Sequence, residues 1–597
     1  MANWDTIVDP AAFLAAALLL HACATSGRTR ALPRRGIPTP VVPARALARL
    51  YRRAWKLAWA HLRAPELGSG FVSDYIDPGF NGDLFQWDLC FIAQYAKYGH
   101  RVFPTPVMLS NLYAKQQPDG FIPRQIATTG DPVKFGDALN PPLYSWAEWD
   151  SYRIRGDRTR LAQVLPVLAR FHRWIVNNRR NADGLYRFED PLGSGMDDQP
   201  RRGSGWIDLS SQMALDARCL ALIAGELSQN ETASAYAAEH AQLADSINRV
   251  LWNEDRRWYE DAGGADFKSV AGFWPLLAGV APEDRAAAVI GRLTDPHEFW
   301  RPTPVPSVSA DSAIYNAPDG DYWRGAVWPP TNYMIVRGLL EVGRPGLAKT
   351  IALEYLRSMV TQLEAQGTLF EHCSPERDCG GGVKDMVGWA GVGPIALLIE
   401  AVLGLRADAP TNTLSWTPLL RARHGIEDLT FGPCTASIVC AARSPDRDYV
   451  IRVETDRPFT LRVATDFAEG TTRLGERSLG PLDDGVACVE VPSGSTEYRI
   501  RGEPRLNGTP PAQPRDLVAT RSEKGTVLRW RACADEDLAG YDVYRTEDHG
   551  WRKINSSLCV WSTCTDDHPP DSRCSYAVAA VDTADNISPM SEPAELA

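Results

Sequence analysis

The stretch RLAQVLPVLARFHRWIVNNRR, residues 160–180, decides the fold class of the longest part of this chain. Its apolar residues recur at steps of three and four, the period of an amphipathic helix: Leu161, Val164, Leu165, Leu168, Phe171 and Trp174. The same pattern returns in SSQMALDARCLALIAGELSQN (210–230), TNYMIVRGLLEVG (331–343) and GPIALLIEAVLGL (393–405). About a dozen such helices between residues 43 and 408, joined by long loops, predict a toroid of helical hairpins.

The hydrophobic period changes to two after about residue 409, which is typical of β-strands. In YVIRVETD (449–456), Tyr449, Ile451 and Val453 share one face, and the polar residues between them share the other. GVACVEV (485–491) alternates in the same way. Residues 409–508 are therefore predicted to form a β-sandwich domain, followed by the Pro-rich linker NGTPPAQPRD.

The last segment, residues 509–597, resembles a fibronectin type III domain, an immunoglobulin-like β-sandwich. VLRWRA (527–532) places Trp530 on the expected second strand, and AGYDVYR (539–545) matches the third. SYAVAAVDTADNIS (575–588) matches the sixth strand and its turn. The resemblance implies a spacer or a module that contacts a surface glycan or protein, and it implies little about catalysis.

Residues 1–42 are predicted to be a lipoprotein-type signal peptide and a tether. The apolar run Ala11–Leu20 is too short to span a bilayer and has the length of a signal-peptide core. The following Leu-His-Ala-Cys resembles the lipobox of bacterial lipoproteins, whose Cys, here Cys23, is lipidated. The Pro- and Arg-rich residues after it are typical of a disordered tether. The sequence thus predicts export to the bacterial cell envelope, with the lipid as the membrane anchor.

The first ten residues do not fit this prediction, because MANWDTIVDP has two Asp and no Lys or Arg, whereas signal peptides usually begin basic. An ordinary helix is the alternative for the apolar run.

Composition narrows the classes of partner. The chain has 597 residues and a formal net charge of −11, without a basic cluster of the kind that follows phosphates, which argues against nucleic acid. Its 19 Trp and 19 Tyr suit either packing or stacking on sugar rings. Short spacings such as Cys373/Cys379 and Cys559/Cys564 predict disulfides in an oxidising compartment. The sequence has no CxxC pair or calcium-type loop, so no metal or other cofactor is predicted.

Four loop segments of the helical region carry side chains that suit chemistry: GDLFQWDLCF (82–91), GSGMDDQPR (193–201), DYWRGAVWPPTNYM (321–334) and GTLFEHCSPE (367–376). Each has an ordinary structural explanation. Asp88 would cap a helix, adjacent Asp residues are common in solvated turns, and aromatic rings pack. Together, however, the segments supply two carboxylates, flat rings and hydrogen-bonding groups.

Glycoside hydrolysis needs this combination. One carboxylic acid protonates the leaving oxygen, and a second carboxylate acts from the opposite face of the sugar. Stacked aromatic rings exclude water and raise the pKa of the acid. A helical toroid brings loops from distant parts of the chain to one rim, so Asp197 and Glu371 are expected to face each other.

The motifs resemble those of the trehalase-like clan of (α/α)6-barrel glycoside hydrolases, above all family 63 and the bacterial mannosylglycerate and glucosylglycerate hydrolases. FQWD is similar to the clan's F-x-W-D, GMDDQPR to G-M-D-N-S-P-R, and YWRGAVWPPTNYM to Y-W-R-G-x-x-W-x-x-x-N-Y. LFEHCSPE is similar to L-x-E-x-Y-x-P-x, and GWAGVG follows as a closing G-W-x-x element does. The resemblance covers about residues 45–405 and implies an inverting hydrolase with an (α/α)6 barrel and no cofactor.

By the same resemblance, Asp197 corresponds to the general acid and Glu371 to the general base. Inversion requires their carboxyl groups to lie about 6.5–9.5 Å apart, with a water between base and sugar. The residues expected to bind the substrate are Trp87, Asp88, Asn140, Arg201, Tyr322, Trp323, Arg324, Gly325, Trp328 and Trp389.

The chain departs from the clan's pattern at several of these positions. Asp198 stands where Asn is usual, Gln199 where Ser is usual, Asn140 where Gln is frequent, and Cys373 where an aromatic residue follows the base. A second carboxylate beside the acid would raise the apparent pKa of the pair unless Arg201 or its neighbour Arg202 compensates.

The leading prediction is an exported inverting glycosidase that cleaves a small α-linked sugar, with an α-glucoside favoured. An α-mannoside or a glycosylglycerate is the alternative substrate. The third hypothesis is a catalytically inactive barrel that binds carbohydrate as a surface lipoprotein. The departures at Asp198 and Cys373 leave this hypothesis open.

Overall fold

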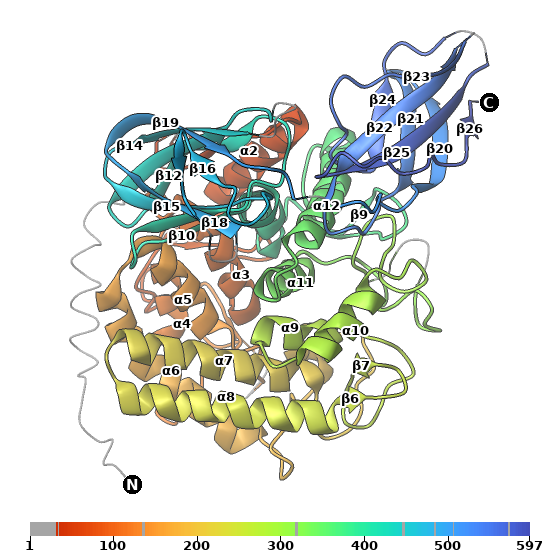
Figure 1. Cartoon of the computed structure of the whole chain (residues 1–597). Helices are drawn as coiled ribbons and strands as arrows, with labels where there is room; N and C mark the ends of the chain where they lie inside the picture. Colours follow the sequence, from red (N-terminus) through yellow and green to blue (C-terminus); the bar gives the residue numbers. More distant parts are fainter. Residues whose placement is uncertain are drawn as a thin grey trace.

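The computed structural model describes residues 31–33, 35–133, 138–316, 320, 322–443, 448–480, 482, 485–505, 507–547, 549–570 and 573–596. The predicted signal peptide and Cys23 lie outside these residues. The chain has several domains: a helical part comes first, and β-sheets follow it (Figure 1).

Residues 160–179 of the stretch lie within α6 (Arg158–Arg179), which confirms the predicted helix. The helix begins where the Asp157 carboxylate accepts a hydrogen bond from the Arg160 amide, at 3.1 Å. All six apolar positions that define its predicted stripe are buried. The opposite face carries Arg and Gln, so the hydrophobic stripe sets how α6 packs.

A second set of helices is buried on nearly every side: α3 (Gln86–Ala96), α5 (Tyr144–Arg155), α7 (Ile207–Glu226), α9 (Trp274–Ala278), α11 (Pro329–Glu341) and the π-helix η6 (Gly393–Val402). Each contacts the next in this order, and η6 contacts α3 in turn. Helices buried all round need apolar residues on every face, and GPIALLIEAV in η6 supplies them. The contacts close a ring.

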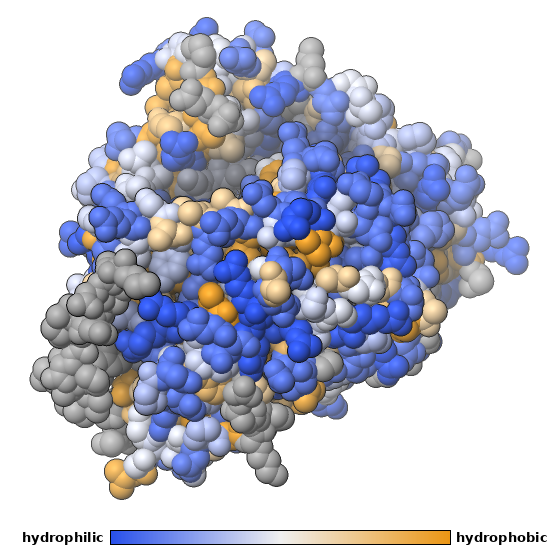
Figure 2. Space-filling view, turned by 90° about the horizontal axis from the view of Figure 1, so that it is seen from below, coloured by the Kyte–Doolittle hydropathy of each residue, from blue (hydrophilic) through white to orange (hydrophobic). Residues whose placement is uncertain are grey.

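The remaining α-helices, called the outer helices below, alternate with these along the chain: α2 (Arg45–Ala60), α4 (Ser110–Tyr113), α6, α8 (Asn230–Val250), α10 (Glu283–Leu293) and α12 (Pro345–Gln366). The helix α8 packs on α7 and buries only Leu243 and Ile247. It lies low in Figure 1, and the face of the molecule seen from below is mostly hydrophilic, with hydrophobic residues in small patches (Figure 2).

The helices that form the closed ring, called the inner helices below, begin near the predicted site. Trp87 and Asp88 lie in the first turn of α3, and Trp328 directly precedes α11. The other ends of the same helices carry buried charges. Arg337 of α11 pairs with Asp150 of α5 at 2.5 Å, and Lys97, just after α3, pairs with Glu400 of η6 at 3.0 Å. Because buried charges are tolerated only when paired, this cluster holds the helices together at the end away from the site.

Short strands and single helical turns make the loops between the helices. They are β2 (Leu62–Arg63), β3 (Tyr75–Ile76), β4 (Leu84–Phe85), β5 (Gln125–Ile126), β6 (Trp252–Asn253), β7 (Trp258–Tyr259), β8 (Phe370–Cys373), β9 (Gly380–Lys384), η1 (Lys97–Gly99), η2 (Val107–Leu109), η3 (Pro191–Ser194), η4 (Val270–Phe273) and η5 (Trp389–Val392). The antiparallel pairs are β2 with β3, β4 with β5, β6 with β7 and β8 with β9.

Two sheets form the middle domain. One has the order β1-β12-β13-β14-β19-β16-β17 and the other β10-β11-β15-β18. Their strands are β1 (Thr39–Val41), β10 (Leu405–Asp408), β11 (Thr413–Trp416), β12 (His424–Phe431), β13 (Cys434–Cys440), β14 (Tyr449–Thr455), β15 (Phe459–Ala464), β16 (Arg473–Leu474), β17 (Arg477–Ser478), β18 (Val486–Val491) and β19 (Gly494–Arg501). Thr39–Val41, within the segment predicted as a tether, instead pairs antiparallel with β12.

The C-terminal strands form a second pair of sheets with a core of their own. The strands are β20 (Arg515–Ser522), β21 (Gly525–Arg531), β22 (Leu538–Glu547), β23 (Gly550–Lys553), β24 (Thr563–Asp566), β25 (Ser575–Asp582) and β26 (Ala594–Glu595). Trp530 of β21 meets Tyr541 of β22 edge to face, with ring centroids 5.1 Å apart. These strands, blue in Figure 1, lie beside α12.

Two further sequence predictions concern cysteines and membrane spans. The cysteines within the described residues are free thiols, including Cys373/Cys379 and Cys559/Cys564, which does not match the predicted disulfides. Along the same residues, none of the helices combines the length and the apolarity that crossing a bilayer requires.

Candidate active site

The loop that carries Asp197 is fixed from several directions. Asp190 caps η3 by accepting from the Gly193 amide at 3.1 Å, and the Asn140 side chain donates to the Gly193 carbonyl at 3.3 Å. The Gln199 amide group donates to the carbonyl oxygens of Ser307 and Trp323, at 2.9 and 2.8 Å. Gln199 thus links the Asp197 loop to the loop that carries Tyr322. Asn140 was predicted to bind the substrate; in the structure its side-chain amide supports the Asp197 loop.

Asp197 has the environment of a general acid. The Tyr322 hydroxyl donates to Asp197 Oδ2 at 2.8 Å, from a residue whose φ of 47° lies in the left-handed region. Burial raises the pKa of Asp197, and the charges of Asp198 and Asp190 raise it further, against the lowering effects of Tyr322 and Arg124. The net direction is upward, which keeps a proton on the carboxyl group to a higher pH.

Asp198 is compensated by a residue that the sequence did not indicate. The Arg324 guanidinium lies 2.8 Å from Asp198 Oδ2, and the Trp323 amide donates to Oδ1 at 3.1 Å. Arg202 pairs with exposed Asp266 instead. The extra carboxylate is thus held by the Tyr322–Arg324 loop, which gives Arg324 a structural partner as well as its predicted place at the sugar site.

Arg201 lies in a different environment from the one expected of a sugar ligand. Its side chain is 3% exposed and forms ion pairs with Asp208, at 2.7 Å, and Asp261, at 2.9 Å. The guanidinium also lies over the Trp206 ring, 4.5 Å from its centroid. Because four of its five N–H donors are engaged by carboxylates, Arg201 ties the loop to the start of α7.

Glu371 lies on β8 of the β8–β9 hairpin and is 8% exposed. The Val383 amide of β9 donates to Glu371 Oε2 at 3.0 Å. Gly382 makes this approach possible, since a Cβ there would lie 2.2 Å from the same oxygen. Burial raises the pKa of Glu371, the Val383 hydrogen bond lowers it, and the charge of Asp197 raises it.

The structure therefore brings the two predicted catalytic carboxyl groups together. Asp197 raises the pKa of Glu371, and Tyr322, bonded to Asp197, is also affected by the charge of Glu371. Asp88, buried in the first turn of α3, interacts with Glu371 and with Arg124. Burial raises the pKa of Asp88 well above its ordinary value. Three loops thus converge on one polar site.

Aromatic rings surround the carboxyl groups. Trp323 and Trp328 stack with centroids 3.9 Å apart and an interplanar angle of 3°. Trp328 also lies 5.9 Å from Trp389, whose indole N–H donates to the Glu371 carbonyl at 3.0 Å. Trp87 lies against the Asp197 loop, because a Cβ placed on Gly195 of that loop would be 3.4 Å from the Trp87 ring. These rings pack around the carboxyl groups, and their contact with a sugar stays a prediction.

The hairpin and the Tyr322 loop are joined through their backbones. Val327 and Cys373 exchange hydrogen bonds of 2.8 and 3.0 Å. Cys373 is buried, and burial raises the pKa of its thiol to about 12, so the thiol remains protonated and packs. Gly325, predicted to bind the substrate, donates its amide to Ser307 Oγ at 2.9 Å. The departure at Cys373 therefore concerns packing beside Glu371.

Sequence reasoning missed two residues. Arg124, before β5, interacts with Asp197, Asp190 and Asp88, and burial lowers its pKa. Phe80 is 37% exposed and meets Trp389 edge to face at 5.8 Å. Neither residue lies in a motif. Arg124 is a lone Arg between Pro123 and β5, and Phe80 lies between Gly79 and Gly82. Among the described residues, no three His, Cys, Asp or Glu side chains form a metal site.

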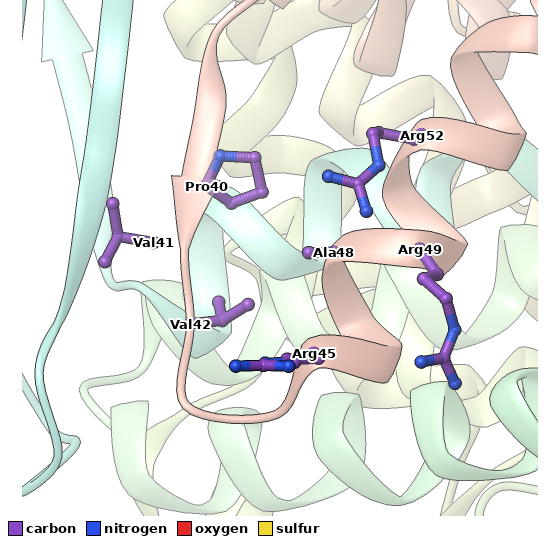
Figure 3. Close-up of a pocket in the computed structure, with 7 residues that line it drawn as sticks. All are labelled: Pro40, Val41, Val42, Arg45, Ala48, Arg49 and Arg52. Carbon is purple, nitrogen blue, oxygen red and sulfur yellow. The ribbon is translucent and has the colours of Figure 1, made fainter.

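A separate cavity of about 470 Å³ lies between β1 and the start of α2 (Figure 3). Its walls are Pro40, Val41, Val42 and Ala48 with three arginines, Arg45, Arg49 and Arg52. None of the candidate site residues lines it.

Comparison with known proteins places this site in a family. Residues 83–386, half of the chain, match the model described as the mannosylglycerate hydrolase MGH1-like glycoside hydrolase domain. The chain belongs to this family and is therefore an O-glycosyl hydrolase. The matched range contains both carboxyl groups and every substrate-binding residue predicted above except Trp389.

Individual relatives are distant. An uncharacterized protein of Borreliella burgdorferi is 23% identical over 65% of this chain and 84% of its own length. A probable mannosyl-oligosaccharide glucosidase of Schizosaccharomyces pombe is 25% identical over 38% of this chain. The mannosylglycerate hydrolase of Rubrobacter radiotolerans is 30% identical over 29% of it. The matches cover only 33% and 38% of the last two proteins.

Among solved structures, the α-L-rhamnosidase from Dictyoglumus thermophilum is similar with a TM-score of 0.55 and 12% identity, over 78% of this chain and 50% of that chain. At this identity the likeness concerns the fold alone.

Two substitutions should move the pKa of Asp197 in opposite directions. Asp198→Asn removes a charge that raises it, so the alkaline limb of the kcat/KM profile should move to lower pH. Tyr322→Phe removes the donor that stabilises the ionised form, so the same limb should move to higher pH. Asp266→Asn, an exposed partner of Arg202, is the matched control. Shifts of equal sign in the two variants would contradict the assignment.

Proposed function

We propose that the chain hydrolyses an α-linked glycoside with inversion, with Asp197 as general acid and Glu371 as general base. The observation that carries this proposal is the meeting of two carboxyl groups, buried Glu371 and half-buried Asp197, where the charge of Asp197 raises the pKa of Glu371. When two such groups interact, they lose their protons in separate steps, which favours a state with one proton on the pair. That state contains one acid and one base.

The proposed reaction is a single displacement. Asp197 gives its proton to the glycosidic oxygen as the bond to the anomeric carbon breaks. Glu371 takes a proton from the water whose oxygen bonds to that carbon from the opposite face. The products are the free sugar and the protonated aglycone, and exchange with solvent returns both carboxyl groups to their starting state.

The remaining substrate contacts are proposed for side chains around this pair. Trp87 and Asp88 begin α3 beside the acid loop and would hold the sugar at the nonreducing side. The segment that precedes α11 supplies Tyr322, Trp323, Arg324, Gly325 and Trp328. Trp389 completes the aromatic wall beside the base Glu371. Arg201 and Asn140 are proposed as supports of the acid loop.

The charge of the site favours a neutral substrate, and we propose an α-glucoside. Carboxyl groups gather in the site: Asp88, Asp190, Asp197, Asp198 and Glu371. Among the described cations, those that interact with Asp197 or Asp198 are Arg124 and Arg324, and Arg324 is already paired. An anionic aglycone such as glycerate would meet an excess of negative charge. The alternative, an α-mannoside or glycosylglycerate, is favoured by the family description and the Rubrobacter relative.

We propose an (α/α)6 barrel and a C-terminal fibronectin type III domain as the architecture. The closed order of contacts through the inner helices and the alternation of outer helices support the first. The three- and four-stranded sheets, with Trp530 on the second strand of the domain, support the second.

Loss of either carboxyl group should abolish most turnover. Asp197→Asn and Glu371→Gln are each expected to lower kcat for an α-glucoside about 10²- to 10⁴-fold, the usual contribution of a general acid or base. Circular dichroism should show an unchanged fold, and Asp266→Asn should retain normal rates. Near-normal kcat in either variant would overturn the assignment. A wild-type protein that binds sugars and hydrolyses none would instead support the inactive, carbohydrate-binding reading.

Two substrates that differ by one carboxylate can separate the proposed specificities. Glucosylglycerol should give a kcat/KM at least about tenfold above that of glucosylglycerate at low ionic strength, because the site repels an anion. The difference should narrow as salt is added. A higher kcat/KM with glucosylglycerate or mannosylglycerate would favour the alternative substrate class.

We propose that the protein is exported and held at the cell envelope by a lipid on Cys23, on the sequence evidence alone. Expressed in a bacterium, the wild-type protein should sediment with membranes and incorporate labelled palmitate. Cys23→Ser should lose the label and move to the soluble fraction, and Cys90→Ser, at a buried thiol, is the control. Equal membrane recovery of wild type and Cys23→Ser, without label in either, would contradict the anchor.

A further inference from the structure

The C-terminal β-domain is fixed to the helix next to the catalytic hairpin. The Glu536 carboxylate accepts from the amides of Gly346 and Leu347, at 2.5 and 3.1 Å, and so caps the N-terminus of α12. Arg344, at the cap position, has no side-chain bond to the helix start. Gly346 permits the contact, since a Cβ there would lie 1.6 Å from the Glu536 carbonyl oxygen. The cap of α12 thus comes from a different domain.

The contact continues along the same helix. Lys349 Nζ donates to the Leu538 carbonyl at 2.5 Å, and burial lowers the pKa of this lysine to about 8. Five residues further on, the Glu354 carboxylate accepts from the amide and the hydroxyl of Ser562, at 2.7 and 2.6 Å. Buried polar groups with partners on both sides leave the interface with one arrangement. The domain is therefore docked on α12 rather than attached by its linker alone.

The interface ends on the hairpin that carries Glu371. Arg357 of α12 bonds Glu354 at 2.9 Å and Asp378 at 2.8 Å, and Asp378 lies in the turn between β8 and β9. Arg529 of β21 pairs with the same Asp378 oxygen, at 2.6 Å. The Asp378 side chain is only 11% exposed. One buried carboxylate of the hairpin is thus shared between the helical domain and the C-terminal domain.

A displacement of this turn would reach Glu371 over a short distance. Asp378 stands two residues before Gly380, where β9 begins, and β9 holds Glu371 through Gly382 and the Val383 amide. On the other strand, Cys373 is bonded to Val327. Glu376 of the same turn is held by Arg301, at 2.7 Å, and by Tyr315, at 2.6 Å. Arg529 comes from the C-terminal domain, as does Arg531, whose charge helps lower the pKa of Glu376.

We propose that Arg529 is a positioning residue of the hydrolase: by holding Asp378 it lets the C-terminal β-domain fix the β8–β9 hairpin and with it the base Glu371. This inference rests on the proposed function of Glu371. It assigns the C-terminal domain a part in catalysis, in addition to any contact it makes outside the molecule.

The test compares three arginine variants. Arg529→Ala should lower kcat about tenfold to a hundredfold with little change in KM, the order expected when a catalytic group is displaced slightly. Arg529→Lys, which keeps a cation near Asp378, should recover a large part of kcat. Arg552→Ala, which breaks the exposed Arg552–Glu547 pair of the same domain, should leave kcat unchanged. Rates are expressed per folded molecule, measured from the amplitude of the unfolding transition.

A double-mutant cycle ties the effect to Asp378. In an Asp378→Ala background, Arg529→Ala should cause no further loss of kcat, since its partner is gone. Hydrogen exchange supplies a measurement without substrate: the Val383 amide should exchange faster in Arg529→Ala and at the wild-type rate in Arg552→Ala.

The outcomes separate this inference from the proposed function. Unchanged kcat and unchanged Val383 exchange in Arg529→Ala, or losses that add fully in the cycle, would overturn the positioning role while wild-type turnover and Asp197→Asn still support the hydrolase. Faster exchange at Val383 in a protein without hydrolase activity would leave the mechanical link standing and overturn the proposed function.

Discussion

The charge interaction between Asp197 and Glu371 is the constraint on which the site depends. The charge of Asp197 disfavours the ionised state of Glu371, and burial raises the pKa of both carboxyl groups. The surrounding structure opposes this with two donors, the Tyr322 hydroxyl and the Val383 amide, and with the charge of Arg124. A site of this kind persists only when its loops are held rigidly, because water would otherwise screen both groups.

The rigidity has an identifiable source in each loop. Gln199 bonds the Asp197 loop to the Tyr322 loop, and Val327 bonds the Tyr322 loop to the Glu371 hairpin. The β8–β9 hairpin is held by Asp378 in its connecting loop, which pairs with Arg357 of α12 and with Arg529 of the C-terminal domain. The same repulsion that makes the carboxyl pair difficult to build gives it one acid and one base, which is the requirement of the proposed reaction.

Much of this could be predicted from the sequence where the evidence is local. The apolar steps of residues 160–180 defined α6, and two separate motifs contained Asp197 and Glu371. What failed was the choice of partners. Arg201 is three residues from Asp198, yet it folds toward Asp208 and Asp261, and Asp198 pairs with Arg324, 126 positions away. Arg124 and Phe80 had no pattern that would reveal them.

The same reason explains one error of organisation and one feature that the sequence analysis did not predict. Thr39–Val41 is too short for a detectable period of two, and its partner β12 lies almost four hundred residues further along the chain. In α12, buried Lys349, Glu354 and Arg357 do not look like core positions. Their partners include Leu538 and Ser562 of the C-terminal domain, so an outer helix is buried on nearly every side.

The anomeric form of the first product tests the central claim most directly. ¹H NMR, recorded within the first minutes of hydrolysis of an α-glucoside, resolves α- from β-glucose before they interconvert. If Glu371 activates a water opposite Asp197, β-glucose should appear first and α-glucose should follow at the rate of mutarotation. Initial release of α-glucose would mean retention of configuration, and it would contradict an acid and a base that act from opposite faces of the sugar.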